Sequence, residues 1–257
     1  MPDKTAHHPD GYHVIKFGEK WHTYKCNHNI KYVSGTKFIS MLFPKFDMVA
    51  VSEKCSAGKN PKYAGRSPLD IRNEWSENGR ISSDEGTNIH EYAESKVSKW
   101  DVSKQPKPLS DRCTAIYKQA DIITSKLLDK FVFVCAEMIV FSPSLKIAGM
   151  VDLVMWSPIT NTILILDWKT NKKSPLDKNG FGKKGFHPVD HLQDTNLNHY
   201  RLQLSLYRFI MENEGYFPRM TKYQQAIIHL SDKSYAVIPL EYYEYEIKEG
   251  LKIYGGK

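Results

Sequence analysis

The segment Thr162–Thr170, with the sequence TILILDWKT, brings four consecutive aliphatic residues directly up to an aspartate, and a lysine follows two residues later. A short apolar run of this kind is typical of a buried β-strand. Residues i and i+2 of a strand point to one face, so we expect Asp167 and Lys169 to project together and Trp168 to point to the opposite face. A buried strand that ends in charge either leaves the core for solvent or carries that charge to a functional site.

Two more β-rich runs precede this segment, and each contains one acidic residue. Residues 131–141 (FVFVCAEMIVF) include Glu137, residues 146–156 (KIAGMVDLVMW) include Asp152, and the turn signals SPS and SPITN separate the three runs. A carboxylate among apolar strand residues is costly to bury unless a positive charge compensates it. A solvated strand face or a surface ion pair explains any one of these residues, but three acids and a lysine on neighbouring strands indicate a site.

Clustered carboxylate oxygens are the ligands that hard divalent cations such as Mg²⁺ or Mn²⁺ prefer. A lysine beside the cation can orient or deprotonate a water molecule for attack on phosphorus, and the cation stabilises the charge that develops on the phosphate oxygens. We expect Lys169 to have this role. Burial lowers the pKa of a lysine while neighbouring carboxylates raise it, so the sequence leaves the balance open.

The remaining chain predicts a mixed α/β fold. The first ten residues are polar and predict a loose terminus, residues 45–66 predict a loop or weak helix, and residues 171–197 predict a long basic loop. Residues 12–17 and 21–26 predict one hairpin, and residues 223–230 and 235–240 predict another. Helices are expected at 34–43 with Ser34 as a cap, 67–79 with Ser67 as a cap, 82–100 from a Ser82–Glu85 capping box, 109–131 with Ser110 or Asp111 as a cap, 197–215, and the closing segment, whose tyrosines also permit a strand.

Composition bounds the class of protein. The 257 residues are 41% hydrophobic and 25% charged, which is typical of a globular chain. No apolar run approaches the roughly 20 residues of a membrane span, and the N-terminus resembles neither an export signal nor a transit peptide, so we expect an intracellular protein, in the cytoplasm of a bacterium or of a virus-infected host cell. The net charge of +7 is a mild indication of a polyanionic partner. The four cysteines have no metal-site spacing and predict free thiols.

The residues GMVDLV (149–154) and ILDWKT (165–170) resemble the core of the PD-(D/E)XK nucleases, with Asp152 as the first acid and Asp167-Trp168-Lys169 as the D-x-K motif. Glu137, one strand upstream, is similar to the acid of the RecB-like branch. GTNIHEYAE (86–94) resembles that branch's G-x-x-x-H-x-x-x-E helix motif, and QLSLY (203–207) its Q-x-x-x-Y motif. The resemblance covers about residues 30–240, most closely 82–210, and extends to viral and phage-type exonucleases and to the mitochondrial genome maintenance exonuclease.

The resemblance implies a restriction-endonuclease-like core, with a central mixed sheet flanked by helices. It further implies one nuclease domain over 1–257, in which 1–108 form an N-terminal hairpin and helical section and 109–257 form the catalytic core. Some RecB-like relatives hold an iron–sulfur cluster with cysteines near the C-terminus; this chain has no cysteine after Cys135, so we expect no such cluster.

The resemblance also implies roles for single residues. His90, Asp152, Asp167, Glu137 and the Trp168 carbonyl would hold one or two Mg²⁺ or Mn²⁺ ions, and Glu94 would support the site or pair with a cation. Gln203 and Tyr207 would contact Lys169 or the scissile phosphate, although Tyr207 also fits an ordinary core position. Phosphate contacts are expected from Thr87 at a helix N-terminus and from basic side chains, namely Lys172, Lys173, Lys183, Lys184 and Arg201.

These features favour a metal-dependent DNA exonuclease of DNA processing, recombination or repair, which hydrolyses phosphodiester bonds through metal-activated water on DNA that is single-stranded or has a free end. An RNA or structure-specific endonuclease with the same site is an alternative. A third possibility is a catalytically silent nucleic-acid-binding protein, against which the presence of every expected acid and the lysine argues.

Overall fold

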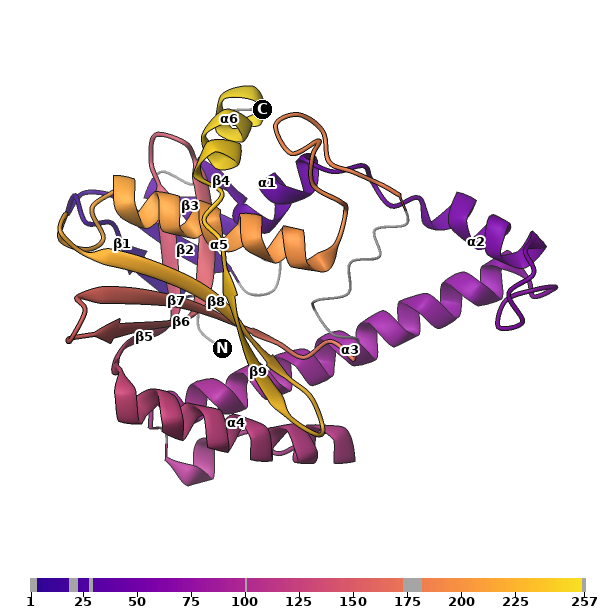
Figure 1. Ribbon diagram of the computed structural model, residues 1–257, viewed down its shortest axis with the longest axis horizontal. Helices are drawn as coiled ribbons and strands as arrows, with labels where there is room; N and C mark the ends of the chain where they lie inside the picture. The colour runs from indigo at the N-terminus through magenta and orange to yellow at the C-terminus, as the bar shows by residue number, and fades with distance from the viewer. Residues whose placement is uncertain (1–3, 19–22, 28–29, 100, 173–181, 256–257) are drawn as a thin grey trace.

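The computed structural model describes residues 4–18, 23–27, 30–99, 101–172 and 182–255, which form a mixed α/β structure around one large sheet (Figure 1). The strands are β1 (Lys4–His7), β2 (Val14–Gly18), β3 (Thr23–Cys26), β4 (Ile30–Ser34), β5 (Val132–Ser142), β6 (Ile147–Ser157), β7 (Thr162–Lys169), β8 (Lys222–Leu230) and β9 (Tyr235–Leu240). The helices are α1 (Gly35–Met41), α2 (Met48–Ala57), α3 (Pro68–Val97), α4 (Asp111–Lys130), α5 (Asn196–Asn213) and α6 (Glu244–Tyr254).

Strand β6 is the centre of the sheet. Its antiparallel pairing with β5 runs along one edge, from Ile147 to Trp156. The opposite edge is divided between two partners: β4 pairs in parallel at Ile147 and Ala148, and β7 pairs antiparallel from Leu153 to Ser157. Residues Gly149–Asp152 lie between these two ladders, and we call them the split edge. Beyond β7 the sheet continues through β8, which is parallel to β7, to β9.

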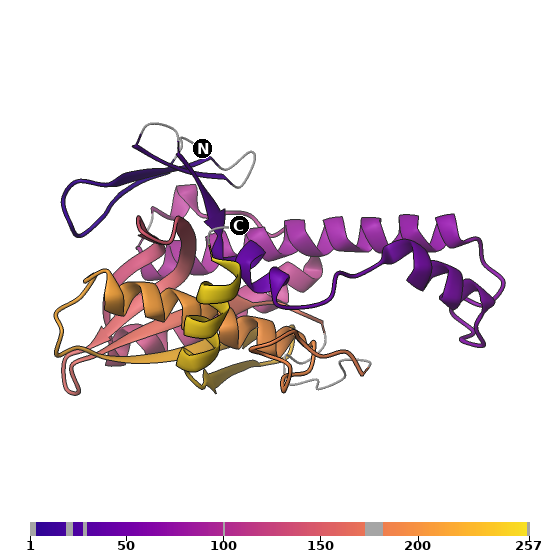
Figure 2. The ribbon, with the colours of Figure 1, turned by 90° about the horizontal axis from the view of Figure 1, so that it is seen from above.

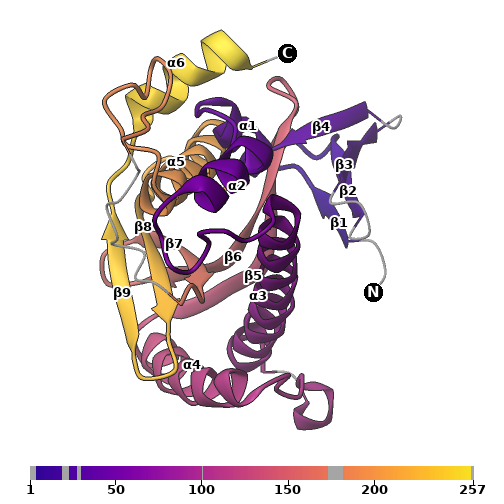
Figure 3. The ribbon, with the colours of Figure 1, turned by 90° about the vertical axis from the view of Figure 1, so that its right-hand side faces the viewer.

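Helices cover both faces of the central strands (Figures 1 and 3). On one face, α1, α5 and α6 share an apolar cluster with alternate residues of β7, such as Ile163 and Ile165. On the other face, α4 and the C-terminal half of α3 pack on Leu166 and Trp168. Because both faces are covered, the middle of β7 lies inside the protein, as its aliphatic run predicts.

The expected break between residues 79 and 82 is wrong, since α3 continues from Pro68 to Val97. Ser67 caps it by accepting a hydrogen bond from the Leu69 N–H, as predicted. Gly79 weakens the helix, but Arg80 pairs with Glu77 and Asp84 across this position, and these pairs support helical backbone on both sides. The N-terminal half of α3 and α2 together project from the body as an arm, which Figure 2 shows.

The predicted loose N-terminus is also wrong from Lys4 onward. Residues Lys4–His7 form β1, which pairs with β2 from Lys4 opposite Phe17 to His7 opposite Val14. The polar sequence of β1 gives no apolar pattern, and the strand exists because β2 offers a free edge. Strand β4 was not predicted either; it joins the N-terminal hairpin to β6.

The other predicted strands, hairpins and helices are confirmed, while residues 173–181 of the predicted basic loop lie outside the described residues. Strands β5, β6 and β7 occupy the three β-rich runs, and β2–β3 and β8–β9 form the two hairpins. Ser34 caps α1, Ser110 caps α4, and Gly215, with φ +72°, follows the end of α5. The closing segment is a helix rather than a strand, and α2 lies in the segment expected to be loop or weak helix. No described helix is long and apolar enough to cross a membrane.

Candidate active site

The two aspartates meet where β6 and β7 separate. Leu153 pairs with Leu166, so the next residue of each strand, Asp152 and Asp167, lie opposite each other at the end of the ladder. Asp152 Oδ2 accepts a hydrogen bond of 2.9 Å from the Trp168 backbone N–H. The carboxylate thus bonds to β7 where the regular ladder has ended, which fixes its position beside Asp167.

Asp167 and Lys169 project from one face of β7, and Trp168 packs into the cluster on the opposite face, as predicted. Lys169 Nζ forms an ion pair with Asp167 Oδ2, and Asp167 is 4% exposed. Burial raises the pKa of Asp167 to about 6, against the opposing effect of Lys169 and with a further increase from Asp152. The acid on β7 therefore stays in the core.

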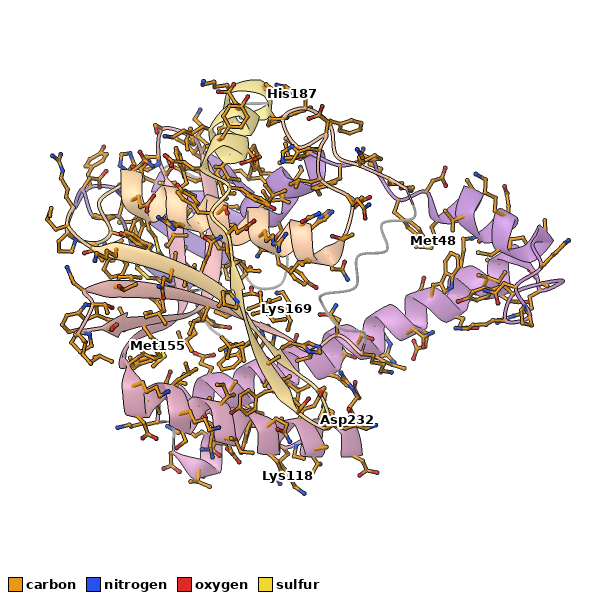
Figure 4. The ribbon with its side chains drawn as sticks, in the orientation of Figure 1. Met48, Lys118, Met155, Lys169, His187 and Asp232 are labelled. Atoms are coloured by element: carbon orange, nitrogen blue, oxygen red, sulfur yellow. The ribbon has the colours of Figure 1, made fainter. Side chains whose placement is uncertain are left out.

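The pKa of Lys169 is raised above its ordinary value. Burial lowers it, but the charges of Asp167 and Asp152 together outweigh burial. Figure 4 shows Lys169 in the middle of the body, between α5 and α3. With the carboxylates ionised and no cation beside them, Lys169 is an ammonium group and not a base.

Glu137 completes the row of acids across three strands. Ala136 pairs with Leu153 and Met138 with Val151, so Glu137 lies opposite Asp152 on β5. Its backbone has φ +49°, a left-handed conformation that costs a non-glycine residue about 1–2 kcal/mol. Its carboxylate pairs with Lys4 of β1. Strain of this kind gathers at functional sites, where the surrounding structure imposes the conformation.

Helix α3 brings His90 and Glu94 to the same acids. His90 Nδ1 lies 3.4 Å from Asp152 Oδ2. Burial raises the pKa of Glu94, Lys4 opposes this shift, and Glu91 and Asp152 add to it. Asp152 thus contributes to the raised pKa of both Asp167 and Glu94, and negative charge gathered in this way is typical of a cation site.

Gln203 and Tyr207 lie on α5, and their contacts differ in part from the prediction. Tyr207 is 2% exposed and belongs to the core cluster, which agrees with the ordinary core interpretation. Its ring packs between Gly35 and Gly149, and Gln203 Nε2 donates a hydrogen bond of 3.1 Å to its hydroxyl. Burial raises the pKa of Tyr207 to about 12. The contact described for Gln203 is therefore with Tyr207, while Lys169 is in contact with Asp167 and Tyr200.

Tyr200 is a site residue that the sequence did not indicate. Lys169 Nζ lies 4.6 Å from the centroid of its ring, a cation–π contact, and its hydroxyl exchanges hydrogen bonds of 3.1 and 3.2 Å with the Asn171 side chain. The Asn171 carbonyl in turn contacts His229 Nε2 at 2.8 Å. Tyr200 is three residues before Gln203 on α5, so helical spacing from the Q-x-x-x-Y motif would have placed it on the same face.

Arg112 was missed as well. Arg112, on α4, donates a hydrogen bond of 2.8 Å to Glu85 on α3 and another to the Thr170 carbonyl, which follows β7. It therefore connects α3, α4 and the end of β7. A cavity of about 500 Å³ adjoins it, lined also by Asn171 and Lys172.

The predicted phosphate-binding residues are scattered. Thr87 lies inside α3, where its N–H is part of the helix, so the prediction of a helix N-terminal phosphate site is wrong. Arg201 Nη1 is 3.3 Å from the Tyr243 hydroxyl, inside the α5–α6 contact. Lys172, Lys183 and Lys184 are exposed, and Lys183 lies over the Phe46 ring at the base of the arm; Lys173 lies outside the described residues.

The residues present fit a divalent cation. Apart from its ion pair with Lys169, the buried Asp167 Oδ2 has no hydrogen bond from the described residues. Carboxylate oxygens with one imidazole are ligands that Mg²⁺ and Mn²⁺ accept. No protein-family model matches the sequence, and a search of curated proteins gives no match. The resemblance to the PD-(D/E)XK nucleases thus depends on the identity and arrangement of these residues alone.

Proposed function

We propose that the protein is a metal-dependent nuclease of the RecB-like PD-(D/E)XK type that hydrolyses DNA, as an exonuclease. One observation carries the proposal: Asp152 and Asp167 lie opposite each other where two strands separate, with Lys169 paired to one and His90 beside the other. A structural ion pair would need one acid and one base. Here acids exceed bases in a largely buried space, which favours a cation as the missing partner.

The proposed ligands are Asp152, Asp167, Glu137 and His90, with the Trp168 carbonyl. A bound Mg²⁺ or Mn²⁺ would supply a Lewis acid for the phosphate oxygens and would lower the pKa of a water nucleophile. Lys4, which pairs with Glu137, is the positive charge that a cation would displace there or share with that carboxylate.

The role of Lys169 depends on the charge around it. Without a cation, two carboxylates keep its pKa high. A bound cation would neutralise much of their charge, so burial, which lowers the pKa, would dominate. Tyr200 lies against the Lys169 amino group and keeps it near the acids. We propose that Lys169 orients the water nucleophile and stabilises charge on the phosphate.

The positive charge of the protein supports the proposal that its partner is DNA. The net charge is +7, and the arm carries the basic side chains of Lys54 and Arg72, while its Lys62 pairs with Glu74. Phosphate contacts by lysine and arginine give affinity that does not depend on sequence. The exposed Lys183 at the base of the arm extends these charges toward the body. We propose that the arm lies along a DNA strand.

The test is degradation of end-labelled linear single-stranded and double-stranded DNA in Mg²⁺, Mn²⁺ or EDTA. Asp152→Asn and Lys169→Ala are each expected to lower the rate by about 10²-fold or more. Asp129→Asn and Lys118→Ala, exposed positions on α4, are matched controls and should leave the rate unchanged. Cleavage that continues in EDTA, or that Asp152→Asn leaves intact, would refute the proposal.

Two further substrates separate the alternatives. An exonuclease degrades linear DNA and spares circular single-stranded DNA of the same sequence, whereas an endonuclease cuts both. A matched RNA tests the sugar preference. If the wild-type protein binds DNA but cuts it with neither metal, the nucleic-acid-binding interpretation replaces the nuclease.

A further inference from the structure

A second group of metal-ligand side chains lies in the loop between β1 and β2, away from the acids of the sheet. In the sequence HHPDGYH (7–13), His8, Asp10 and His13 present ligand atoms that all lie within 4.8 Å of one another. Asp10 Oδ2 is 3.0 Å from His8 Nδ1 and 2.7 Å from His13 Nδ1. One carboxylate oxygen thus lies between two imidazole nitrogens, and it forms a hydrogen bond with His13 Nδ1.

The loop holds this arrangement by its own hydrogen bonds. The His8 N–H donates to the His13 carbonyl at 2.8 Å, and the Gly11 N–H donates to the His8 carbonyl at 3.0 Å. Asp10 Oδ1 accepts from the N–H groups of Tyr12 and His13, which leaves Oδ2 toward the imidazoles. Gly11 has φ +74°, which only glycine adopts at little cost. The three side chains are therefore positioned before any ligand binds.

His8 has the environment of a metal-bound imidazole. It is 6% exposed, and its ring packs against Phe141 and Tyr216 with centroid distances of 5.0 and 5.8 Å. The Asp10 N–H donates to its Nδ1 at 3.2 Å, and the same nitrogen lies 3.0 Å from Asp10 Oδ2. Nε2 lies 3.3 Å from Glu214 Oε2, an approach without hydrogen-bond geometry, so this buried nitrogen has no hydrogen-bond partner among the described residues. Metal-binding histidines usually direct their second nitrogen to such a carboxylate, which fixes the tautomer.

We propose that His8, Asp10 and His13 bind Zn²⁺, with Glu214 beside the second nitrogen of His8 and able to accept its proton once Nδ1 binds the metal. Two imidazoles and one carboxylate suit Zn²⁺ far better than Mg²⁺, which prefers oxygen ligands. Ligation by His8 Nδ1 replaces the hydrogen bond from the Asp10 N–H, which at 3.2 Å is among the longer ones. Three protein ligands leave the fourth tetrahedral position to water.

The proposed zinc site would join the two ends of the loop between β1 and β2, to which all three ligands belong, independently of nuclease activity. His8 connects the hairpin to Glu214, which follows α5, and to Phe141 of β5. The same hairpin carries Lys4, which pairs with Glu137. Zinc would hold in place a strand whose own polar sequence provides little apolar contact.

The test uses protein in which Asp152→Asn and Asp167→Asn have removed the acids of the sheet. Zn²⁺ binding is measured by competition with a chromophoric chelator, and Co²⁺ is added separately to read imidazole ligation from its visible absorption. We expect a single tight equivalent, lost in His13→Ala and in Asp10→Asn and retained in His7→Ala, the matched exposed neighbour. Glu214→Gln should weaken binding by about 10–100-fold.

Thermal unfolding with and without Zn²⁺ provides the second readout, since a ligand that binds only the folded state raises the midpoint. The midpoint should rise in the background protein and in His7→Ala, and should not move in His13→Ala, whose exposed loop position allows normal folding. Equal Zn²⁺ affinity in His13→Ala and His7→Ala, or no Zn²⁺ binding by the background protein, would overturn the proposal.

Discussion

Replacing Gly149 by alanine tests the packing that supports the split edge. A Cβ at this position would lie 2.0 Å from Tyr207 Cε1, 2.5 Å from Cζ and 2.8 Å from the hydroxyl. The ring cannot withdraw freely, because a Cβ at Gly35 would lie 2.6 Å from the same Cε1 atom, so both backbones already contact it. Gly149→Ala must therefore displace a buried tyrosine.

The expected cost follows from three contributions. Overpacking a core costs about 1–3 kcal/mol, and contacts this short place Gly149→Ala at the upper end. Moving the ring also breaks the hydrogen bond from Gln203, worth about 1 kcal/mol. Alanine lowers the conformational entropy of the unfolded chain, which stabilises the folded state by about 0.4–1 kcal/mol. The net expectation is a loss of about 3 kcal/mol in the free energy of unfolding.

Urea denaturation, followed by circular dichroism, measures this loss as a lower midpoint with an unchanged slope. Gly79→Ala is the matched control, because a Cβ there meets nothing within 4 Å inside α3; it should stabilise by about 0.5–1 kcal/mol. A double-mutant cycle isolates the cause. Tyr207→Ala alone should cost about 3–5 kcal/mol, and in that background Gly149→Ala should cost nothing.

The reasoning is refuted if Gly149→Ala is as stable as the wild type, or if it costs the same with and without the Tyr207 ring. Tyr207→Phe separates packing from hydrogen bonding, because it keeps the ring and removes the hydroxyl. A loss of about 1 kcal/mol is expected for it. Under the proposed function, displacement of Tyr207 also moves Gln203, so Gly149→Ala should lower nuclease activity, whereas Gly79→Ala should not.

Three more predictions concern charges near the site. The pKa of Asp167 is raised to about 6, so below that pH a cation must displace a proton from this carboxyl group. The Mn²⁺ affinity, measured by calorimetry, should therefore be constant above pH 6 and fall about tenfold per pH unit below it. A constant affinity down to about pH 5 would contradict this prediction. Arg112→Met leaves Glu85, 8% exposed, without its cation and should cost about 2–4 kcal/mol in urea denaturation, part of which Glu85→Gln in the same protein should restore. Glu137→Gly should be about 1 kcal/mol more stable than Glu137→Ala, because glycine adopts the positive φ of this position at little cost. Both variants should lose Mn²⁺ affinity to the same extent. Equal stabilities of the two variants would show that the backbone is unstrained.

The central strands could be predicted because their pattern is local. Residues 163–166 are apolar in succession, and such a run occurs where both faces of a strand are covered. The same-face relation of Asp167 and Lys169 follows from the strand period alone. The closeness of Asp152 to Asp167 follows from adjacency of consecutive strands, which the turn signals between them indicate.

Other features depend on contacts between distant segments, which no local pattern records. The polar strand β1 forms only because β2 offers an edge to pair with. Helix α3 continues through Gly79 because ion pairs around Arg80 support it, whereas a glycine followed by a capping box reads as a stop and a new start. The positive φ of Glu137 and the cation–π contact of Tyr200 are likewise set by tertiary packing.

The split edge explains why charge can lie inside this sheet. Along a continuous ladder, the backbone groups of β6 and β7 would bond to each other, and a side chain such as Asp152 would meet only apolar neighbours. Where β7 diverges, the Trp168 N–H loses its strand partner, and the Asp152 carboxylate supplies the acceptor. The same divergence leaves room beside Gly149 for Tyr207 on one side and for His90 of α3 near Asp152. Asp167, the aspartate at the end of the aliphatic run, thus does not leave the core: it lies beside Asp152 where β6 and β7 separate, the point at which the Trp168 N–H takes a side-chain acceptor.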